Sequence, residues 1–335
     1  MGARQPTSIS GPYFEDLAVG DALTAPAVTL TDGRVAVHQA ILGDRVPAYL
    51  DTGLSKRVFG GVTPAPPGLV IDLAIGQSSV FTRRVLANLF YRGLQLYRLA
   101  AIGDTLSTIT EVVALRQNRL RPDRRATGLA VLRIRTVDQE GRLVLDFERC
   151  AMLPLRDQQL KTGNNDVVGS DRARFDLGAA EQLASPWDLA ALRNVVPGPF
   201  ASELKVGDRF EIEEADPVTA ATELARLTIN LAEVHYDRRA SATGRRLVYG
   251  GHTIGLAAHQ AAKALPALCA VIAWESCDHT GPVHEDDLLT SVVSVERVSA
   301  LSAASRLVSL RSVVRAHRDT APAEVLDWRY VAAIA

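Results

Sequence analysis

A histidine and an amide side chain stand five residues apart in the stretch "NLAEVHYDRRAS", as His235 and Asn230. Imidazole has an ordinary pKa of about 6.5, so a histidine can take up and release a proton near neutrality. A carboxamide can orient a water molecule or donate to it, but it exchanges no proton at pH 7. The pair therefore predicts proton transfer by His235, with Asn230 holding water.

Several interpretations of this pair stay open. Asn230 positions water for a single base, or Glu233 or Asp237 supplies the missing carboxylate, or the site binds its ligand without turning it over. On an extended strand, positions 233, 235 and 237 would share one face, and both carboxylates would reach the histidine. A histidine that merely closes the end of a strand is the non-functional interpretation.

A second stretch that could take part in a reaction lies about 15 residues further on, in "YGGHTIG". Its glycine pair precedes a stretch with helical spacing, and glycine allows close approach to the backbone. The first N–H groups of a helix have no intrahelical acceptor and face negative charge favourably. The N–H groups at the start of this helix, around Gly251 and His252, are therefore candidates to face negative charge on a ligand.

Composition excludes several functional classes. The 335 residues carry 37 basic and 38 acidic side chains, a formal charge of −1, so no overall field attracts nucleic acid or an anionic membrane. Three scattered cysteines favour a reducing compartment, and no apolar run approaches the ~20 residues that span a bilayer. We therefore expect a cytoplasmic protein without nucleic-acid or membrane partners.

Known cofactor motifs are also missing from the sequence. The histidines show no metal-ligand spacing, and there is neither a Walker loop nor a dinucleotide-binding glycine motif after a strand. The sequence predicts no metal site and no cofactor.

The chain repeats itself, which constrains the architecture that must position these groups. Three landmarks recur in the same order, at offsets of 187, 190 and 181 residues: Val19-Gly20-Asp21 as Val206-Gly207-Asp208, "VFGG" from Val58 as "VYGG" from Val248, and "VLDF" from Val144 as "VLDW" from Val325. The polar segment between the copies is rich in Gly, Asn and Asp. We predict an N-terminal domain over 1–155, a linker over 156–184, and a C-terminal domain over 185–335 that opens with a short helix at Ser185.

Each copy has the same order of expected elements. A Gly-Asp turn precedes a helical stretch, such as 250–265, and several runs rich in Val, Ile, Leu and Thr follow it. One long helix followed by four or five antiparallel strands predicts an α+β layer in which the sheet wraps the helix. This is the hotdog fold, and the duplication makes it a double hotdog.

With this architecture, the sequence resembles the MaoC-like (R)-specific enoyl-CoA hydratase family in its double-hotdog form. It is also similar to the long bacterial mesaconyl-CoA hydratase and methylmalyl-CoA dehydratase branch. The family motif places a Gly-Asp pair, a Pro and a His before a small residue. Copy two keeps His235 and Ser241 but has Asn230 in the aspartate place, whereas copy one keeps Asp44 and has Tyr49 in the histidine place.

The resemblance implies an acyl-CoA hydratase or dehydratase, an (R)-specific lyase that adds water reversibly across a 2-enoyl thioester. His235 would be the base, Asn230 the group that orients water, and Gly251 the oxyanion donor, supported by Asp237, Ser241 and His252. Coenzyme A would enter only as part of the substrate, with its phosphates on Arg245 and Arg246.

Other expectations follow from the two unequal copies. The prolines of "FGGVTPAPPGLV" crowd the helix start of copy one, so this copy should carry a degenerate site and help to shape the acyl pocket. A composite site of Asp44 with His235 is disfavoured, because the two sites of a hotdog pair lie apart. The fused copies already form a pseudo-dimer, so the protein would be a monomer or a homodimer. The alternatives are an acyl-CoA-binding protein without catalysis and, less favoured, a thioesterase.

Overall fold

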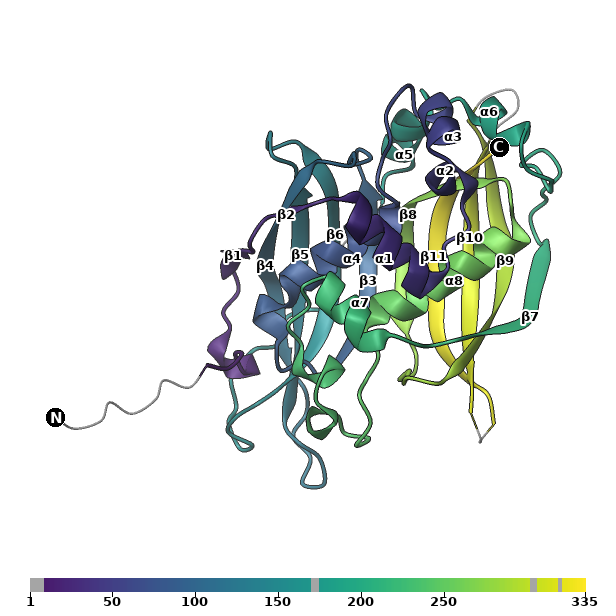
Figure 1. Cartoon of the computed structure of the whole chain (residues 1–335). Coiled ribbons are helices and arrows are strands. Elements are labelled where there is room, and N and C mark those ends of the chain that lie inside the picture. Colours follow the sequence, from purple (N-terminus) through teal and green to yellow (C-terminus); the bar gives the residue numbers. More distant parts are fainter. Residues whose placement is uncertain (1–8, 170–174, 302–305, 319–320) are drawn as a thin grey trace.

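The computed structural model describes residues 9–169, 175–301, 306–318 and 321–335. One antiparallel sheet of 11 strands runs through these residues, and helices lie across one of its faces (Figure 1). The predicted α+β double hotdog is therefore confirmed. No helix among the described residues is long and apolar enough to cross a membrane.

The sheet joins the two copies of the repeat edge to edge. Its strands follow the order β1-β4-β5-β6-β3-β8-β11-β10-β9-β7, with β2 also paired to β4. The antiparallel pair β3–β8, in which Tyr91 lies opposite Cys277, connects the halves. The strands span β1 Ala22–Thr24, β2 Val28–Thr29, β3 Ala87–Leu96, β4 Thr105–Gln117, β5 Thr127–Val137, β6 Leu143–Pro154, β7 Arg209–Pro217, β8 Leu268–His279, β9 Leu288–Ala300, β10 Arg306–His317 and β11 Ala323–Ile334.

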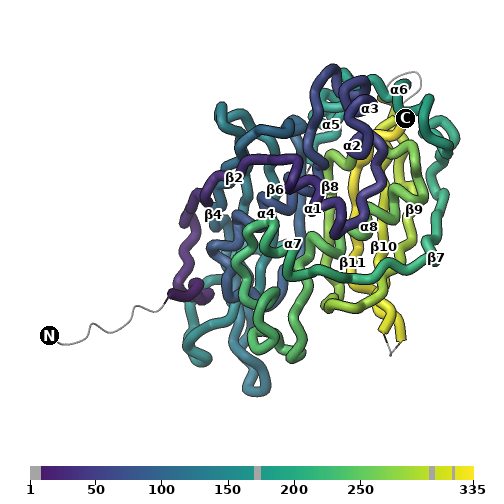
Figure 2. Tube along the Cα trace, in the orientation of Figure 1, coloured from purple at the N-terminus to yellow at the C-terminus, as the bar shows by residue number. Residues whose placement is uncertain are grey.

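Two central helices, one from each half, lie side by side on the sheet (Figure 2). Nearly every side chain of α4 is buried, as its continuous apolar sequence predicts, while α8 turns Lys263 outward. The α-helices span α1 Asp32–Leu42, α2 Pro47–Leu50, α3 Thr52–Val58, α4 Pro67–Gln77, α5 Leu177–Ala184, α6 Leu189–Arg193, α7 Ala221–Leu227 and α8 Gly250–Ala264. The 3-10 helices span η1 Phe14–Asp16, η2 Ser78–Thr82, η3 Glu233–His235 and η4 Arg238–Ala240.

Equivalent hydrogen bonds recur in the two halves. Gly20 and Gly207 have φ of 93° and 95°, values that glycine tolerates best, and each donates its N–H to a strand carbonyl. Near the ends of the central helices, Gln77 donates to the Leu106 carbonyl at 3.1 Å and Gln260 to the Leu289 carbonyl at 2.8 Å. The sequence repeat thus corresponds to a repeat of local structure.

The segment between the copies lies along the protein surface. Gln117, at the end of β4, donates from its side chain to Leu160 at 2.6 Å and accepts from Thr162 at 2.7 Å. Helix α5 lies within the predicted linker. The helix expected at Ser185 begins instead at Leu189, because the Asp188 carboxylate caps it by accepting from the Ala191 N–H at 3.3 Å.

Candidate active site

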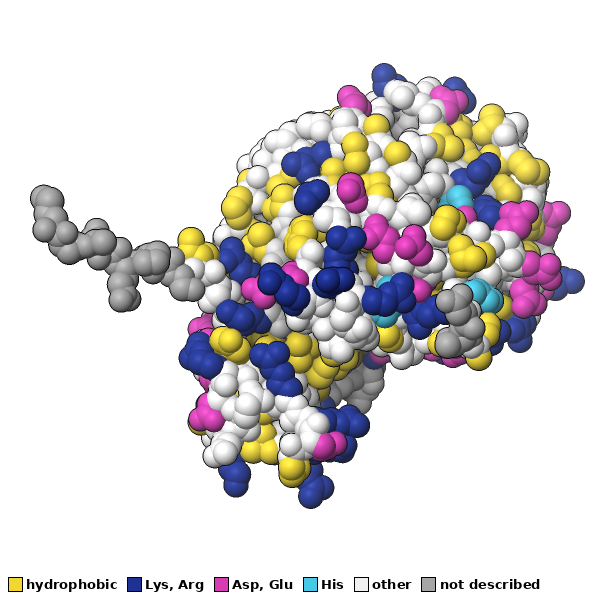
Figure 3. Space-filling model, turned by 60° about the horizontal axis from the view of Figure 1, so that its bottom comes forward, with side chains coloured by type: hydrophobic (Ala, Val, Ile, Leu, Met, Phe, Trp, Pro, Cys, Tyr) yellow, Lys and Arg dark blue, Asp and Glu magenta, His cyan; other side chains and the backbone are white. Residues whose placement is uncertain are grey.

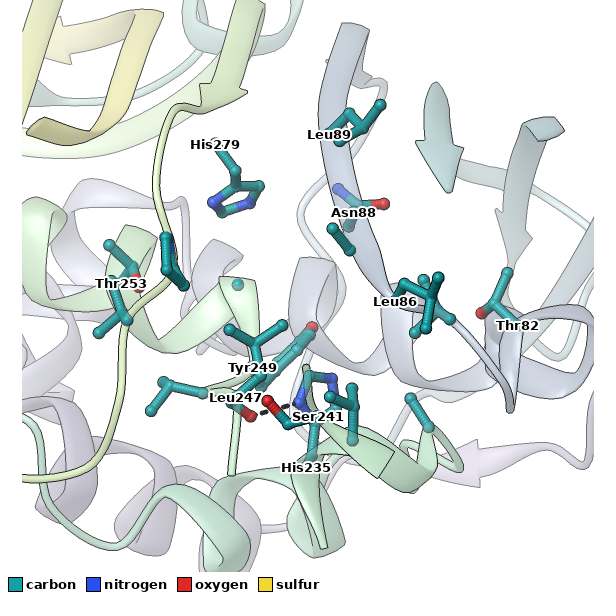
Figure 4. A pocket seen from close by; sticks show the side chains of 18 of the residues that line it. Thr82, Leu86, Asn88, Leu89, His235, Ser241, Leu247, Tyr249, Thr253 and His279 are labelled. Atoms are coloured by element: carbon teal, nitrogen blue, oxygen red, sulfur yellow. Dashed lines mark hydrogen bonds between the residues drawn. The ribbon is translucent and has the colours of Figure 1, made fainter. Parts of the chain in front are cut away.

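His235 lines a cavity of about 340 Å³ between the two halves. It stands at the end of η3, and residues 241–250 pass beside it into the N-terminus of α8. The opposite wall comes from the N-terminal half, where η2, the start of β3 and one residue of β6 contribute side chains. Figure 4 shows Tyr249, Thr253 and His279 on one side of the cavity and Thr82, Leu86 and Asn88 on the other.

The imidazole of His235 is held by one hydrogen bond. Its Nδ1 lies 2.8 Å from the Leu247 carbonyl oxygen, which can only accept, so Nδ1 carries the proton (Figure 4). Nε2 then has a free lone pair. The edge of the ring contacts Tyr249. Enclosure by the cavity wall lowers the pKa of His235 to about 4, so the ring is neutral and can accept a proton at pH 7.

Asn230 also lines the cavity, in the loop between α7 and η3. Its Oδ1 accepts from the Ala232 N–H at 2.9 Å, which leaves Nδ2 to donate to water. In the other half, Asp44 Oδ1 accepts from the Val46 N–H at 3.0 Å. Two residues at matching places in the motif therefore make the same turn.

The carboxylate alternative for the catalytic pair is wrong. Residues 233–235 form a 3-10 turn and not a strand, so side chains two positions apart do not share a face. Asp237 instead caps η4 and binds the Arg239 guanidinium at 2.7 Å, while the Glu233 side chain is exposed. Neither carboxylate lines the cavity, and the part of the chain that the structure describes supplies no Asp or Glu to its wall.

The two glycines at the start of α8 have different surroundings. Gly250 lines the His235 cavity, and a Cβ there would lie 2.7 Å from His279 Nε2. Gly251 lies on the other side, where a Cβ would come 2.0 Å from Asp72 Oδ1. Gly250 is thus the glycine of the pair that borders this cavity, because the Cα–Cβ directions of consecutive helical residues lie about 100° apart. The role of Gly251 as oxyanion donor stays a prediction.

Of the expected supporting residues, only Ser241 lines the cavity. Its hydroxyl pairs with the Thr243 hydroxyl at 3.0 Å. His252 is fully buried in α8, outside the cavity wall, and neither ring nitrogen has a hydrogen-bond partner among the described residues. Burial lowers the pKa of His252 to about 4.

Sequence reasoning missed the side chains that the N-terminal half contributes. Arg149 of β6 and Asn88 of β3 line the His235 cavity, as does His279 at the end of β8. Burial lowers the pKa of His279 to about 4. These positions lie outside the repeated motif, so only the alternation of the strands could have indicated that Arg149 faces inward.

Arg245 and Arg246 lie outside the cavity, beside a surface hollow that Tyr236, Arg238 and His284 also line. Arg246 pairs with Glu285 at 2.8 Å, and Arg245 donates to the Glu285 carbonyl at 3.1 Å. Lys and Arg side chains gather across this lower face of the molecule (Figure 3). Thr243, in the cavity wall, contacts His284 at 3.0 Å, so the cavity and the hollow are neighbours.

A second, smaller cavity of about 80 Å³ occupies the matching place in the other half. Asp44 and Tyr49 line it, together with residues of α8, so Asp44 does not meet His235. Burial raises the pKa of Asp44. The adjoining helix α4 begins at Pro67 after Pro66, the crowded start that the sequence predicts.

Asp72 of α4 connects the walls of the two cavities. Its carboxylate lies 3.0 Å from His38 Nε2 and accepts from the Tyr249 hydroxyl at 3.1 Å. His38 lines the small cavity and Tyr249 the large one. The buried carboxylate of Asp72 therefore links one side chain from each cavity wall across the junction of the halves.

The fold and this site define a double-hotdog protein with a histidine-containing cavity between its halves. No family model matches the chain. A solved structure of a conserved hypothetical protein from Mycobacterium tuberculosis, described as having a double hotdog fold, is 49% identical with a TM-score of 0.87, over 96% of this chain and 98% of that one.

Two curated relatives carry enzyme names. A beta-methylmalyl-CoA dehydratase of Chloroflexus aurantiacus is 27% identical over 96% of both chains. A mesaconyl-CoA hydratase of Cereibacter sphaeroides is 26% identical over 83% of this chain and 81% of its own. These similarities support the predicted relation to the MaoC-like hydratase and dehydratase family.

Proposed function

We propose that this protein is an acyl-CoA hydratase or dehydratase that adds water reversibly across a 2-enoyl thioester. The observation that carries the proposal is the free Nε2 of His235, which lines a cavity next to the N-terminus of α8. The names of the two curated relatives support the reaction class. The (R)-configuration of the 3-hydroxyacyl product is part of the proposal.

Hydration would begin with a water held between Asn230 and His235. Nε2 takes one proton while the water oxygen bonds to C3, and the electrons of the double bond move onto the thioester as an enolate. In this proposal the N–H groups at the start of α8, that of Gly250 among them, would donate to that oxygen. The imidazolium then returns its proton to C2, so one base serves both steps. The imidazolium of His235 and the enolate form together. The attraction between these opposite charges offsets the low pKa of His235.

Coenzyme A would lie across the neighbouring hollow, with the acyl chain passing Ser241 and Thr243 into the cavity. Arg245 and Arg246 would hold its phosphates. Glu285 already pairs with Arg246, so phosphate binding requires that contact to be exchanged. No resident cofactor is needed for this chemistry.

The second candidate is an acyl-CoA-binding protein without catalysis. It is favoured because the described residues place no carboxylate in the cavity wall beside His235. A thioesterase is less consistent, because the described wall offers no carboxylate to activate water for attack on C1.

Loss of enoyl thioester absorbance with crotonyl-, hexenoyl- and mesaconyl-CoA tests the proposal. His235→Ala should lower kcat/KM by about 10²-fold or more. Tyr49→Phe, at the equivalent turn of the other half, is the matched control and should leave turnover unchanged. Activity that survives His235→Ala would contradict the mechanism, and binding of CoA esters without turnover would support the second candidate.

A further inference from the structure

His279, the last residue of β8, presents an unpaired imidazole nitrogen to the His235 cavity. Its side chain lines the cavity, and Figure 4 shows the ring turned inward. Nε2 is buried and has no hydrogen-bond partner among the described residues. The Tyr91 ring contacts the imidazole edge to face, with the ring centroids 5.8 Å apart. Buried polar atoms are seldom left without a partner, so Nε2 is available to a ligand.

The ring of His279 lies against the first turn of α8. A Cβ on Gly250 would lie 2.7 Å from His279 Nε2, so glycine leaves the room that the imidazole needs. Gly250 is the first residue of α8, and its N–H therefore has no acceptor within the helix. The nitrogen and the Cβ of one residue are about 2.5 Å apart, so Nε2 lies at most about 5.2 Å from the Gly250 nitrogen. One oxygen about 2.9 Å from each nitrogen can bridge that separation.

The ligand atom at this place must be a hydrogen-bond acceptor. Arg149 can only donate, so Asn88 turns its Oδ1 to Arg149 Nη1, at 3.3 Å, and its Nδ2 away. This Nδ2 is buried without a partner among the described residues, and Figure 4 shows it on the side of the amide that faces His279. The described cavity wall contains no Asp or Glu that could accept instead. The surrounding groups are donors, which favours a ligand oxygen that accepts from Nε2.

His279 differs from His235 in what its ring can do. Burial lowers the pKa of His279 to about 4, so the ring is neutral at pH 7. A neutral imidazole can donate one hydrogen bond to a developing oxyanion without giving up its proton. His235 holds its proton on Nδ1, against the Leu247 carbonyl, and its Nε2 is left to accept. One histidine can therefore take a proton while the other donates a hydrogen bond.

We propose that His279 is a further catalytic residue, which donates from Nε2 to the thioester carbonyl oxygen beside the N–H groups at the start of α8. This inference rests on the proposed function. When water bonds to C3, negative charge develops on that oxygen, and a hydrogen bond to a charged acceptor is about twice as strong as one to a neutral acceptor. Nε2 keeps its proton throughout, and it stabilises the enolate more than the bound substrate.

Two replacements of His279 separate donation from packing. His279→Phe keeps a ring against Tyr91 but has no donor, whereas His279→Gln loses the ring and keeps an N–H near the place of Nε2. His279→Phe should lower kcat for crotonyl-CoA by about 10²-fold with little change in KM, and His279→Gln should recover about tenfold of that loss. Wild-type kcat in His279→Phe, or a lower kcat in His279→Gln than in His279→Phe, would show that the ring only fills space and would overturn the inference.

Trp274→Phe is the matched control. Trp274 also lies on β8, contacts Tyr91 edge to face and has a buried N–H without a partner among the described residues. It lines the second, smaller cavity and not that of His235. Its replacement should leave kcat for crotonyl-CoA unchanged. A fall in kcat as large as that of His279→Phe would contradict the assignment.

Binding of acetoacetyl-CoA separates this inference from the proposed function. Its keto form has no carbon–carbon double bond to hydrate, and its enolate absorbs in the near ultraviolet and resembles the reaction intermediate. The wild-type protein should raise the enolate fraction of the bound thioester. His279→Phe should weaken binding of the enolate by about tenfold and change the affinity for butyryl-CoA, which forms no comparable enolate, much less.

The outcomes of this measurement do not depend on turnover. An enolate fraction that is the same with the wild-type protein and with His279→Phe would overturn the assignment, whether or not the protein is a hydratase. An enolate that depends on His279, without turnover of any enoyl-CoA, would support the assignment and contradict only the proposed function.

Discussion

Asn230 and Asp44 occupy the same turn in the two halves, each accepting a hydrogen bond from the N–H two residues ahead, at 2.9 and 3.0 Å. The turn tolerates either side chain, so the amide beside His235 is not required by the local backbone. The two halves have divided the motif: one keeps the histidine and the other keeps the aspartate.

Because an aspartate already fits this turn in the other half, Asn230→Asp should fold normally. The new carboxylate would lie near His235, raise the pKa of its imidazole and share in proton transfer. We expect kcat for enoyl-CoA hydration to rise about tenfold. The reciprocal Asp44→Asn, in the small cavity, should leave kcat unchanged. A lower kcat for Asn230→Asp would show that the amide serves a different mechanism.

The dependence of kcat/KM on pH reports the protonation of His235 in the free enzyme. Its pKa is lowered to about 4, first by burial and in part by the charge of Arg149. The neutral ring is the active base, so activity should be level from neutrality down to about pH 5.5 and should fall only as pH approaches 4. An acid limb near pH 6.5 would contradict the assignment. Arg149→Gln should move this limb to higher pH.

Stability should also depend on pH through three histidines. Burial lowers the pKa values of His235, His252 and His279 to about 4, against about 6.5 in an unfolded chain. Between these values the unfolded chain binds more protons, so the free energy of unfolding is greatest above pH 6.5 and falls as pH drops towards 4.

Urea denaturation at several pH values measures that fall. Of the three titrating rings, only that of His252 lies outside the cavity wall. His252→Phe removes it and should make the decline of the free energy of unfolding shallower. A free energy of unfolding that stays level from pH 7 to 4.5 in the wild-type protein would contradict these pKa shifts.

Replacing each glycine of the pair by alanine should separate function from stability. At Gly250 the new methyl group meets His279 in the cavity, so Gly250→Ala should reduce kcat/KM while the fold persists. At Gly251 it meets Asp72 Oδ1 and the Tyr249 ring in the core, so Gly251→Ala should lower the free energy of unfolding by about 2 kcal/mol. Measurements of activity and of thermal melting distinguish the two variants. A loss of stability for Gly250→Ala and a loss of activity alone for Gly251→Ala would contradict the assignment of Gly250 to the cavity.

The sequence by itself determined the duplicated α+β architecture and the place of the histidine motif. Both depend on local signals: apolar periodicity, glycine turns such as Gly20 and Gly207, and the short spacing from Asn230 to His235. Such signals act over a few residues and can be recognised without knowing which segments meet.

Only the tertiary structure decided what surrounds the histidine. Arg149 reaches the cavity because β6 pairs with β3 and β3 pairs with β8, which brings the N-terminal half against residues 230–250. The same packing turns Gly250 to the cavity and Gly251 to Asp72, and it leaves 233–235 as a 3-10 turn. The partners of a side chain depend on strand register and helix rotation, which are properties of the assembled sheet and cannot be recognised within a short segment.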